Sequence, residues 1–291
     1  MVYDCIIIGN GPAGISAALY TIRSNMKTLV IGTGDSTLKK AKEIENYYGF
    51  AQPISGERLI SEGEQQLKRL GGTILDDEVI GIDKEDVFRV KTASNEYQAL
   101  SVLIATGQKR VNIRIRNLKN FEGKGISYCS TCDGFFYRGK TVGVLGYKDF
   151  ALSEANELLN VTEDITIFTN GQKTEFTQES LIDKFPINEK PISSFEGEEV
   201  IEKIVFEDGS EAALSGLFIA YGSASSVNFA LKMGIATTQD QSIVVDDNQE
   251  TNIPGLYAAG DCTGIFKQIS VAVGQGAIAG KNMIDYVRAN C

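Results

Sequence analysis

Apolar residues gather in short runs along the first part of the chain, separated by longer segments of mixed character. Residues 3–8 and 28–31 are apolar, β-favouring runs, which are typical of strands buried in a parallel sheet. Between them, residues 15–20 are small and apolar, as expected for a helix that packs on such a sheet. The pattern predicts a strand–helix–strand unit at the N-terminus.

The same pattern returns in the middle of the chain. Residues 141–145 form a second buried strand, a helix continues to about residue 159, and another strand covers residues 164–168. The other predicted elements are helices over 56–70 and 269–288 and strands over 73–83, 87–92, 97–104 and 214–220. Two repeated strand–helix–strand units predict an α/β fold with two Rossmann-like three-layer domains.

A glycine motif directly follows the first strand. Residues 9–14 read Gly-Asn-Gly-Pro-Ala-Gly and lead into the first helix. In this frame Gly9 permits a tight turn, Gly11 lets a pyrophosphate approach the backbone, and Gly14 lets the helix pack closely on the strand. The helix N-terminus offers free N–H groups to the anion, and Asp35 after the second strand is the candidate partner of a ribose. The motif predicts a dinucleotide site.

The corresponding loop of the second unit lies between a strand and a helix, as in a dinucleotide site, but it lacks the residues that bind the nucleotide. Gly146 keeps the tight turn and Ala151 is an accepted third residue, but Lys148 stands where a glycine would let a pyrophosphate approach. Tyr147 and Phe150 add bulk, and no arginine pair follows the next strand to hold an NADP 2′-phosphate. We therefore expect this domain to have lost nucleotide binding.

Two cysteines just before this loop carry the candidate chemistry. Cys129 and Cys132 are three positions apart, so their sulfurs can close into a disulfide or open to two thiols. The chain has no histidine, which excludes Ser-His-Asp and Cys-His catalysis and histidine metal sites. Asp133 is therefore the nearest group that can carry a proton. A zinc or iron–sulfur site would need two more ligands, and the other cysteines are isolated, so we expect no metal.

Composition and charge narrow the class of protein. The formal net charge is −10, which argues against general nucleic-acid binding. No apolar run approaches the roughly 18–20 residues that span a bilayer, and the first residues lack the features of a signal peptide. We therefore expect a cytoplasmic protein without nucleic-acid or membrane partners. In that reducing compartment, a cysteine pair of this spacing is more often catalytic than structural.

One stretch of this acidic chain is strongly basic. Residues 109–124 contain a single acidic residue, Glu122, and the basic residues Lys109, Arg110, Arg114, Arg116, Lys119 and Lys124. The stretch is either a solvated connector between domains or a docking patch for an acidic partner.

In combination, these motifs resemble the low-molecular-weight thioredoxin reductases over essentially the whole chain. The matching positions are residues 9–14, Glu45-Asn46, Ala105-Thr106-Gly107, residues 125–137, Gly260-Asp261 and Lys267-Gln268. The resemblance implies the fold of the pyridine nucleotide-disulfide oxidoreductases of class II. It further implies a homodimer and an FAD-binding domain made of residues 1–112 and 241–291, with residues 113–240 as a central domain that carries the cysteine pair.

The resemblance also implies roles for individual residues. Cys132 faces the flavin, Cys129 attacks thioredoxin, and Asp133 donates or accepts the proton. The implied FAD site consists of Gly9, Gly11, Pro12, Ala13, Gly14, Asp35, Thr37, Asn46, Val79, Ala105, Thr106, Gly107, Gly260, Asp261, Lys267, Gln268 and Ile269.

The chain departs from the family pattern where NADPH would bind. The family's Gly-Gly-Gly-x-Ser-Ala is Gly-Tyr-Lys-Asp-Phe-Ala at residues 146–151, and its His-Arg-Arg is Thr-Asn-Gly at residues 169–171. This pattern is similar to the ferredoxin-dependent flavin thioredoxin reductases. That similarity implies electron flow from reduced ferredoxin to FAD, then to Cys129 and Cys132, then to thioredoxin. Residues 109–124 become the candidate ferredoxin surface, because ferredoxins are typically acidic.

Two alternatives remain for the electron path. One is an ordinary NADPH-dependent thioredoxin reductase with a degenerate glycine loop. The other is an FAD-dependent dithiol oxidase that passes electrons to oxygen.

Overall fold

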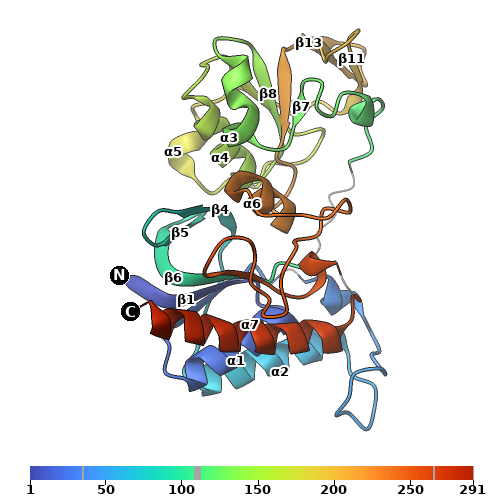
Figure 1. The fold of residues 1–291 in the computed structure, drawn as a ribbon. Helices are drawn as coiled ribbons and strands as arrows, with labels where there is room; N and C mark the ends of the chain where they lie inside the picture. Colours follow the sequence, from blue (N-terminus) through green and yellow to red (C-terminus); the bar gives the residue numbers. More distant parts are fainter. Residues whose placement is uncertain (35, 108–112, 265, 291) are drawn as a thin grey trace. The chain divides into compact units, whose positions relative to one another are not determined.

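The chain forms two compact units. The computed structural model describes residues 1–34, 36–107, 113–264 and 266–290, so Asp35, Lys109 and Arg110 lie outside the described residues. Unit 1 comprises Met1–Lys109 and Ser225–Cys291, and unit 2 comprises Arg110–Ala224 (Figure 1). The chain returns to unit 1 at Ser225, earlier than the predicted residue 241. The reason is that helix α6 (Ser226–Met233) packs against strand β4 (Val79–Lys84) of unit 1.

Unit 1 is built on one mixed sheet. Its strands are β1 (Val2–Ile8), β2 (Thr28–Ile31), β3 (Thr73–Leu75), β4 (Val79–Lys84), β5 (Phe88–Thr92), β6 (Glu96–Ile104) and β15 (Leu256–Ala258). The order is β3-β2-β1-β6-β5-β4, parallel from β3 to β6 and antiparallel from β6 to β4. The long strand β6 joins the parts, because residues 96–99 pair with β5 and residues 102–104 pair in parallel with β15.

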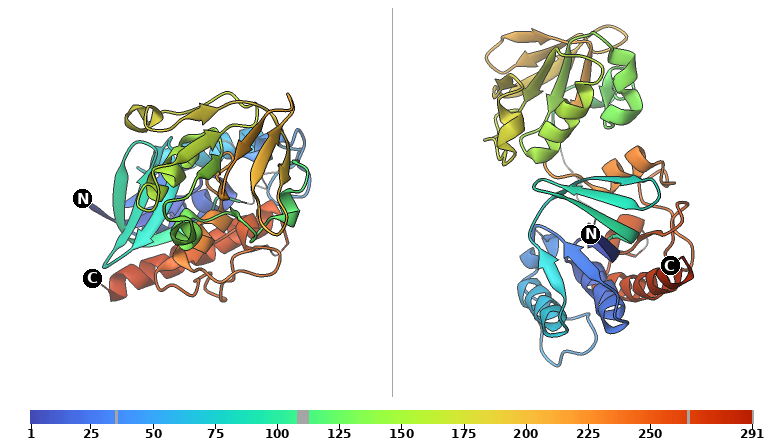
Figure 2. Two further views of the ribbon diagram at one scale, coloured as in Figure 1. Left: turned by 90° about the horizontal axis from the view of Figure 1, so that it is seen from above. Right: turned by 90° about the vertical axis from the view of Figure 1, so that its left-hand side faces the viewer.

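Three helices cover one face of this sheet. Helices α1 (Pro12–Arg23), α2 (Gly56–Arg69) and α7 (Ile269–Ala289) lie on the same side of β1 and β6 in Figure 1. Helix α7 lies beside α1, as the right-hand view of Figure 2 shows. Glycines on α7 allow this approach, because a Cβ on Gly276 would lie 2.1 Å from the carbonyl oxygen of Ala13. Among the described residues, no helix combines the length and the apolar character that crossing a membrane requires.

The predicted single strand over residues 73–83 is wrong. Strand β3 pairs with β2 at one edge of the sheet, whereas β4 pairs with β5 at the opposite edge. Three acidic residues, Asp76, Asp77 and Glu78, separate the two strands and are neither helix nor strand. The strands β4, β5 and β6 all belong to the main sheet.

Unit 2 contains a second α/β sandwich. Its parallel sheet has the order β10-β9-β8-β14-β7, with strands β7 (Ile126–Ser127), β8 (Val142–Leu145), β9 (Ile165–Phe168), β10 (Ile187–Asn188) and β14 (Gly216–Ile219). An antiparallel sheet is made of β11 (Ile192–Glu196), β12 (Lys203–Phe206) and β13 (Glu211–Ala213). The helices are α3 (Ser130–Asp133), α4 (Asp149–Leu158) and α5 (Glu179–Ile182). Two α/β units confirm the predicted fold class.

Candidate functional site

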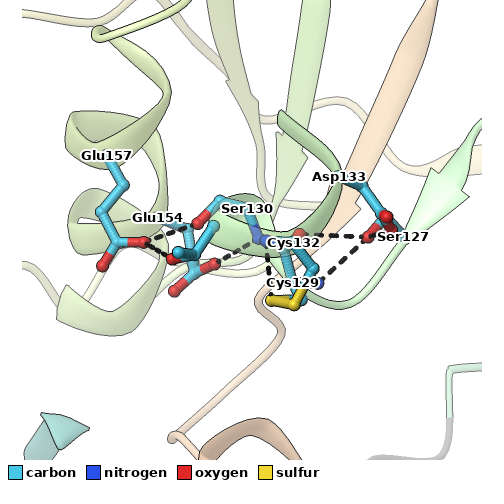
Figure 3. The surroundings of a disulfide bond; sticks show 8 residues. Ser127, Cys129, Ser130, Cys132, Asp133, Glu154 and Glu157 are labelled. Atoms are coloured by element: carbon cyan, nitrogen blue, oxygen red, sulfur yellow. Dashed lines mark hydrogen bonds between the residues drawn. A yellow bond between two sulfur atoms is a disulfide. The ribbon is translucent and has the colours of Figure 1, made fainter. Parts of the chain in front are cut away.

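The predicted disulfide is present in unit 2. Cys129 and Cys132 are bonded at the start of α3, with their Cα atoms 5.3 Å apart (Figure 3). Cys129 is only 3% exposed, whereas Cys132 is exposed. The backbone N–H of Cys132 donates to Cys129 Sγ at 3.1 Å. An N–H that donates to a sulfur stabilises negative charge there, so this contact favours Cys129 as the thiolate after reduction.

Asp133 is held beside the first cysteine by a serine that the sequence did not single out. Ser127, at the end of β7, is buried and donates from Oγ to Asp133 Oδ2 at 2.6 Å. The backbone N–H of Cys129 donates to the same Ser127 Oγ at 3.1 Å. Ser127 thus connects the Asp133 carboxylate to the cysteine backbone, and Figure 3 shows the three residues together on one side of the loop.

Two glutamates of α4 contact the opposite side of the cysteine loop. Glu154 is 1% exposed, and its Oε2 accepts a hydrogen bond from the backbone N–H of Ser130 at 3.3 Å. Glu157 Oε2 accepts from the hydroxyls of Ser130 and Thr131, both at 2.8 Å (Figure 3). Their spacing of three puts both on one helical face, but no sequence pattern indicated that this face meets the cysteines.

An exposed aromatic pair follows the cysteines. Phe135 and Phe136 lie in the 3₁₀ turn of Gly134–Tyr137, are 67% and 68% exposed, and have ring centroids 6.3 Å apart. The guanidinium of Arg138 lies over the Phe135 ring at 5.3 Å. Large exposed aromatic side chains are typical anchors of protein contacts. Two adjacent phenylalanines after a polar turn were a sequence signal that could have identified this surface.

The degenerate glycine loop of unit 2 is occupied by the protein's own side chains. Lys148 Nζ forms an ion pair with Glu175 Oε2 at 3.0 Å. The buried carboxylate of Asp149 accepts hydrogen bonds from the backbone N–H of Thr177 at 2.7 Å and from its hydroxyl. The segment 175–177 is therefore fastened to the residues that open helix α4. Lys148 is the only basic residue of the loop at 146–151, and its charge is therefore already paired with a carboxylate of the same chain.

The first glycine motif has the close contacts and the open space that a dinucleotide requires. A Cβ on Gly14 would lie 1.9 Å from the carbonyl oxygen of Gly9, and a Cβ on Gly9 would lie 2.3 Å from that of Ala105. By contrast, a Cβ on Gly11 would meet nothing within 4 Å. Gly11 caps α1 without a side-chain hydrogen bond, and Pro12 follows it. Space over Gly11 at a helix N-terminus fits a pyrophosphate.

The structure brings several of the predicted FAD residues together in unit 1. Asn46 Nδ2 donates to Gln268 Oε1 at 2.9 Å, which joins positions 222 residues apart. Gly260 lies against Ala13, because a Cβ at Gly260 would be 3.1 Å from the Ala13 Cβ. The backbone N–H of Ala105 donates to the carbonyl of Ile8, which places residues 105–107 at the glycine motif.

The remaining predicted residues are placed as follows. Asp261 begins a short 3₁₀ turn (Asp261–Thr263), and Lys267 and Ile269 flank Gln268 at the start of α7. Thr37 begins another 3₁₀ turn (Thr37–Lys40) and is exposed. Val79 is buried at the start of β4, an edge strand of the sheet.

A cavity of about 540 Å³ opens beside the glycine motif. Its walls come from the start of α1, from α2, from α7 and from the loop of residues 47–50. Gly11, Pro12 and Ile269 of the predicted FAD set line it, together with Tyr47 and Phe50. Cofactor sites are typically concave, mostly apolar and roughly 300–1,000 Å³ in volume, so the cavity suits part of a flavin nucleotide.

The two other described cysteines have raised thiol pKa values. Burial raises the pKa of the Cys262 thiol to about 12 and also raises the pKa of the Cys5 thiol. Both are buried in unit 1, where they behave as small apolar residues. Within the described parts of the chain, no group of three or more His, Cys, Asp or Glu could hold a metal ion.

Comparison with known proteins gives one consistent result. The profile of the family described as pyridine nucleotide-disulphide oxidoreductase matches residues 3–276. The thioredoxin reductase of Listeria innocua is 33% identical over 305 aligned residues, covering 98% of this chain and 94% of that protein.

Two solved structures are similar over the whole length. The atypical thioredoxin reductase TRi of Desulfovibrio vulgaris Hildenborough is 42% identical, with a TM-score of 0.95 and 99% of each chain covered. A ferredoxin-flavin thioredoxin reductase of Clostridium acetobutylicum is 30% identical, with a TM-score of 0.73 and 99% of each chain covered.

Proposed function

The chain belongs to the pyridine nucleotide-disulphide oxidoreductase family, and we propose that it is a flavin-dependent thioredoxin reductase whose electron donor is reduced ferredoxin. Electrons pass through FAD in unit 1 and the Cys129–Cys132 disulfide in unit 2 to the disulfide of thioredoxin. Relatives at 32–33% identity over nearly the whole chain are thioredoxin reductases, which supports disulfide reduction as the reaction.

FAD is the cofactor that unit 1 fits. The open space over Gly11, the α1 N-terminus and the adjacent cavity suit a dinucleotide with a large aromatic ring system. The paired side chains of Asn46 and Gln268 offer hydrogen-bonding groups from two distant segments. When bound, FAD supplies a redox group that can take up electrons singly and give them up in pairs.

The ion pair of Lys148 with Glu175 is the observation that carries the choice of donor. A nucleotide pyrophosphate needs close approach to the backbone and positive charge at this loop. Here the loop has a lysine in place of the glycine, and that lysine is paired with a carboxylate of its own chain. NADPH would have to compete with Glu175 for the positive charge of Lys148. We therefore propose that NADPH is not used.

Ferredoxin is a sufficient donor on energetic grounds. A low-potential ferredoxin near about −400 mV and thioredoxin near about −270 mV differ by roughly 130 mV. For two electrons this is on the order of 6 kcal/mol downhill. Two reduced ferredoxins and two protons convert one thioredoxin disulfide to its dithiol.

The residues of unit 2 carry the disulfide exchange. The thiolate favoured at Cys129 attacks a sulfur of the thioredoxin disulfide, and Cys132 then attacks the mixed disulfide and restores the internal bond. Asp133, held by Ser127, donates or accepts the proton of this step, since the chain has no histidine. Because Cys129 is 3% exposed, its attack requires the surroundings of the loop to open first.

Two surfaces of unit 2 suit the two protein partners. Phe135 and Phe136 present exposed apolar area next to the cysteines, which fits the thioredoxin contact. Arg114, Lys119 and Lys124 of the basic run are exposed and fit an acidic ferredoxin. The proposal includes a homodimer, which sedimentation equilibrium can test. It also includes a cytoplasmic location, where thioredoxin keeps thiols reduced.

Turnover with defined donors tests the proposed function. FAD-loaded protein and thioredoxin disulfide are mixed anaerobically with reduced ferredoxin or with NADPH, and thioredoxin thiols are counted. We expect thiols with ferredoxin only. Cys129→Ser or Cys132→Ser should abolish thiol formation but leave flavin reduction by ferredoxin intact. Turnover with NADPH alone, or rapid peroxide formation in air with a small dithiol, would favour the two alternative functions.

A further inference from the structure

The loop between the two cysteines is hydrogen-bonded to two carboxylates on α4. Glu154, which is 1% exposed, accepts from the backbone N–H of Ser130 at 3.3 Å. Glu157, which is half-buried, accepts from the hydroxyls of Ser130 and Thr131. Figure 3 shows both carboxylates directed at the loop from the same helix. The segment that joins the sulfurs is thus hydrogen-bonded to two carboxyl groups.

Two backbone N–H groups of the loop donate to different acceptors. The N–H of Cys132 donates to Cys129 Sγ, but the N–H of Ser130 donates to the Glu154 carboxylate. The first amide after Cys129 is therefore engaged by a carboxylate. A negative charge on this buried carboxyl group would be poorly screened by water and would therefore act strongly on neighbouring groups.

Whether a carboxylate raises or lowers the reduction potential of the cysteine pair follows from the redox reaction. Reduction breaks the S–S bond and adds two electrons, and proton uptake converts the sulfurs to thiols or leaves one as a thiolate. The disulfide is neutral, whereas the reduced pair can bear negative charge. A nearby carboxylate therefore disfavours the reduced state and makes the dithiol a stronger reductant. The opposite case is also known, since a stabilised reduced form makes a cysteine pair a strong oxidant.

We propose that Glu154 and Glu157 are positioning residues that lower the reduction potential of the Cys129–Cys132 pair. They hold the loop through hydrogen bonds with Ser130 and Thr131. Their negative charge makes the dithiol a stronger reductant of the substrate disulfide. The inference rests on the proposed function, in which this pair must reduce thioredoxin. It concerns residues that neither the glycine motifs nor the cysteine spacing identified.

The test is the redox equilibrium of the pair in glutathione buffers. Full-length protein is equilibrated with mixtures of reduced and oxidised glutathione at about pH 8.5, near the ordinary pKa of a thiol, so that thiolate contributes to the reduced state. Samples are acid-quenched and alkylated, and the peptide that contains both cysteines is quantified by mass spectrometry. The variants are Glu154→Gln, Glu157→Gln and the double variant. Glu163→Gln is the control, which removes one exposed charge in the turn after α4.

We expect Glu154→Gln to shift the equilibrium about tenfold toward the dithiol, which is about 30 mV for two electrons. Glu157→Gln should shift it in the same direction by a smaller factor, and Glu163→Gln should leave it within about twofold. Glutamine keeps an oxygen that can accept from Ser130. If Glu154 acted only by holding the loop, Glu154→Gln would keep the wild-type redox equilibrium, and only Glu154→Ala would change it.

Equilibria of Glu154→Gln and Glu157→Gln within about twofold of wild type would overturn the inference. If Glu154→Gln does not fold, as judged by its thermal midpoint, the half-buried Glu157 carries the test alone. The measurement uses neither ferredoxin nor thioredoxin. An incorrect electron donor would therefore leave this result intact, and an unshifted potential would leave the proposed function intact.

Discussion

The clearest test of the cofactor site is a pair of glycine-to-alanine substitutions three residues apart. Gly11→Ala adds a methyl group where the structure has nothing within 4 Å. The backbone of Gly11 has φ −79° and ψ −175°, which alanine adopts without strain. Gly14→Ala adds the same methyl group 1.9 Å from the carbonyl oxygen of Gly9. Both changes are chemically identical, so they separate loss of ligand space from loss of packing.

The two substitutions should change the stability of the protein differently. At Gly14 the new methyl is about 1.5 Å short of the ordinary contact distance of 3.4 Å, and the obstacle is backbone that moves only with the turn. Such overpacking costs about 1–3 kcal/mol, which lowers the thermal midpoint by about 2–4 °C per kcal/mol in a domain of this size. At Gly11 alanine should be neutral or stabilise the apoprotein by up to about 1 kcal/mol.

The two variants should also bind FAD differently. Gly11→Ala places its methyl in the path of the pyrophosphate, so FAD affinity should fall at least about tenfold, or about 1.4 kcal/mol. The assay combines calorimetric FAD titration of each apoprotein with its thermal midpoint. Wild-type FAD affinity in Gly11→Ala would refute the placement of the pyrophosphate. An unchanged midpoint in Gly14→Ala would refute the packing of α1 on the glycine turn.

Three further predictions concern the proton carrier Asp133, the basic run and the buried Cys262. Asp133→Asn should slow thioredoxin reduction by about 10²–10⁴-fold while leaving flavin reduction by ferredoxin unchanged in stopped-flow traces, because only the exchange step loses its proton carrier. The double variant Lys119→Glu/Lys124→Glu should raise the KM for ferredoxin several-fold and weaken its salt dependence in steady-state assays, whereas Lys173→Glu should not. The Cys262 thiol has its pKa raised to about 12 from 9.0, so its contribution to stability is complete below about pH 9 and is lost as the pH rises toward 12. Urea titrations should therefore give a falling free energy of unfolding across that window, and iodoacetamide at about pH 8 should spare Cys262 in the native protein.

Each of these has an outcome that contradicts it. Full thioredoxin turnover in Asp133→Asn would show that another group moves the proton. An equal effect of Lys173→Glu on the ferredoxin KM would show that net charge, and not the basic run, governs docking. Alkylation of native Cys262 at a rate similar to an exposed thiol would show that the core around it opens readily.

The sequence predicted those elements whose signals are local. The apolar runs at residues 3–8 and 28–31 and the glycines between them define β1, α1 and β2, because a buried parallel strand and a tight turn each need their own residues. The helices α2 and α7 were predicted to within about one residue of their observed ends. The cysteine spacing predicted the disulfide.

The sequence could not predict which distant segments meet. The apolar content of residues 73–83 suggested one strand, but whether a run belongs to one edge of a sheet or two depends on partners elsewhere. The hydrogen bond from Asn46 to Gln268 joins positions 222 residues apart. Glu154 looked like an ordinary polar position of a helix. Only the packing of α4 against α3 turns it toward Ser130.

The most direct test of the proposed electron path is anaerobic stopped-flow mixing of the oxidised, FAD-loaded protein with three donors in turn. Flavin absorbance is followed after mixing with reduced ferredoxin, with NADPH and with NADH. We predict prompt bleaching with reduced ferredoxin and an unchanged spectrum with either nicotinamide, because Lys148 replaces a glycine of the second loop and is paired with Glu175. Prompt bleaching by NADPH would contradict it, and so would an unchanged spectrum with reduced ferredoxin.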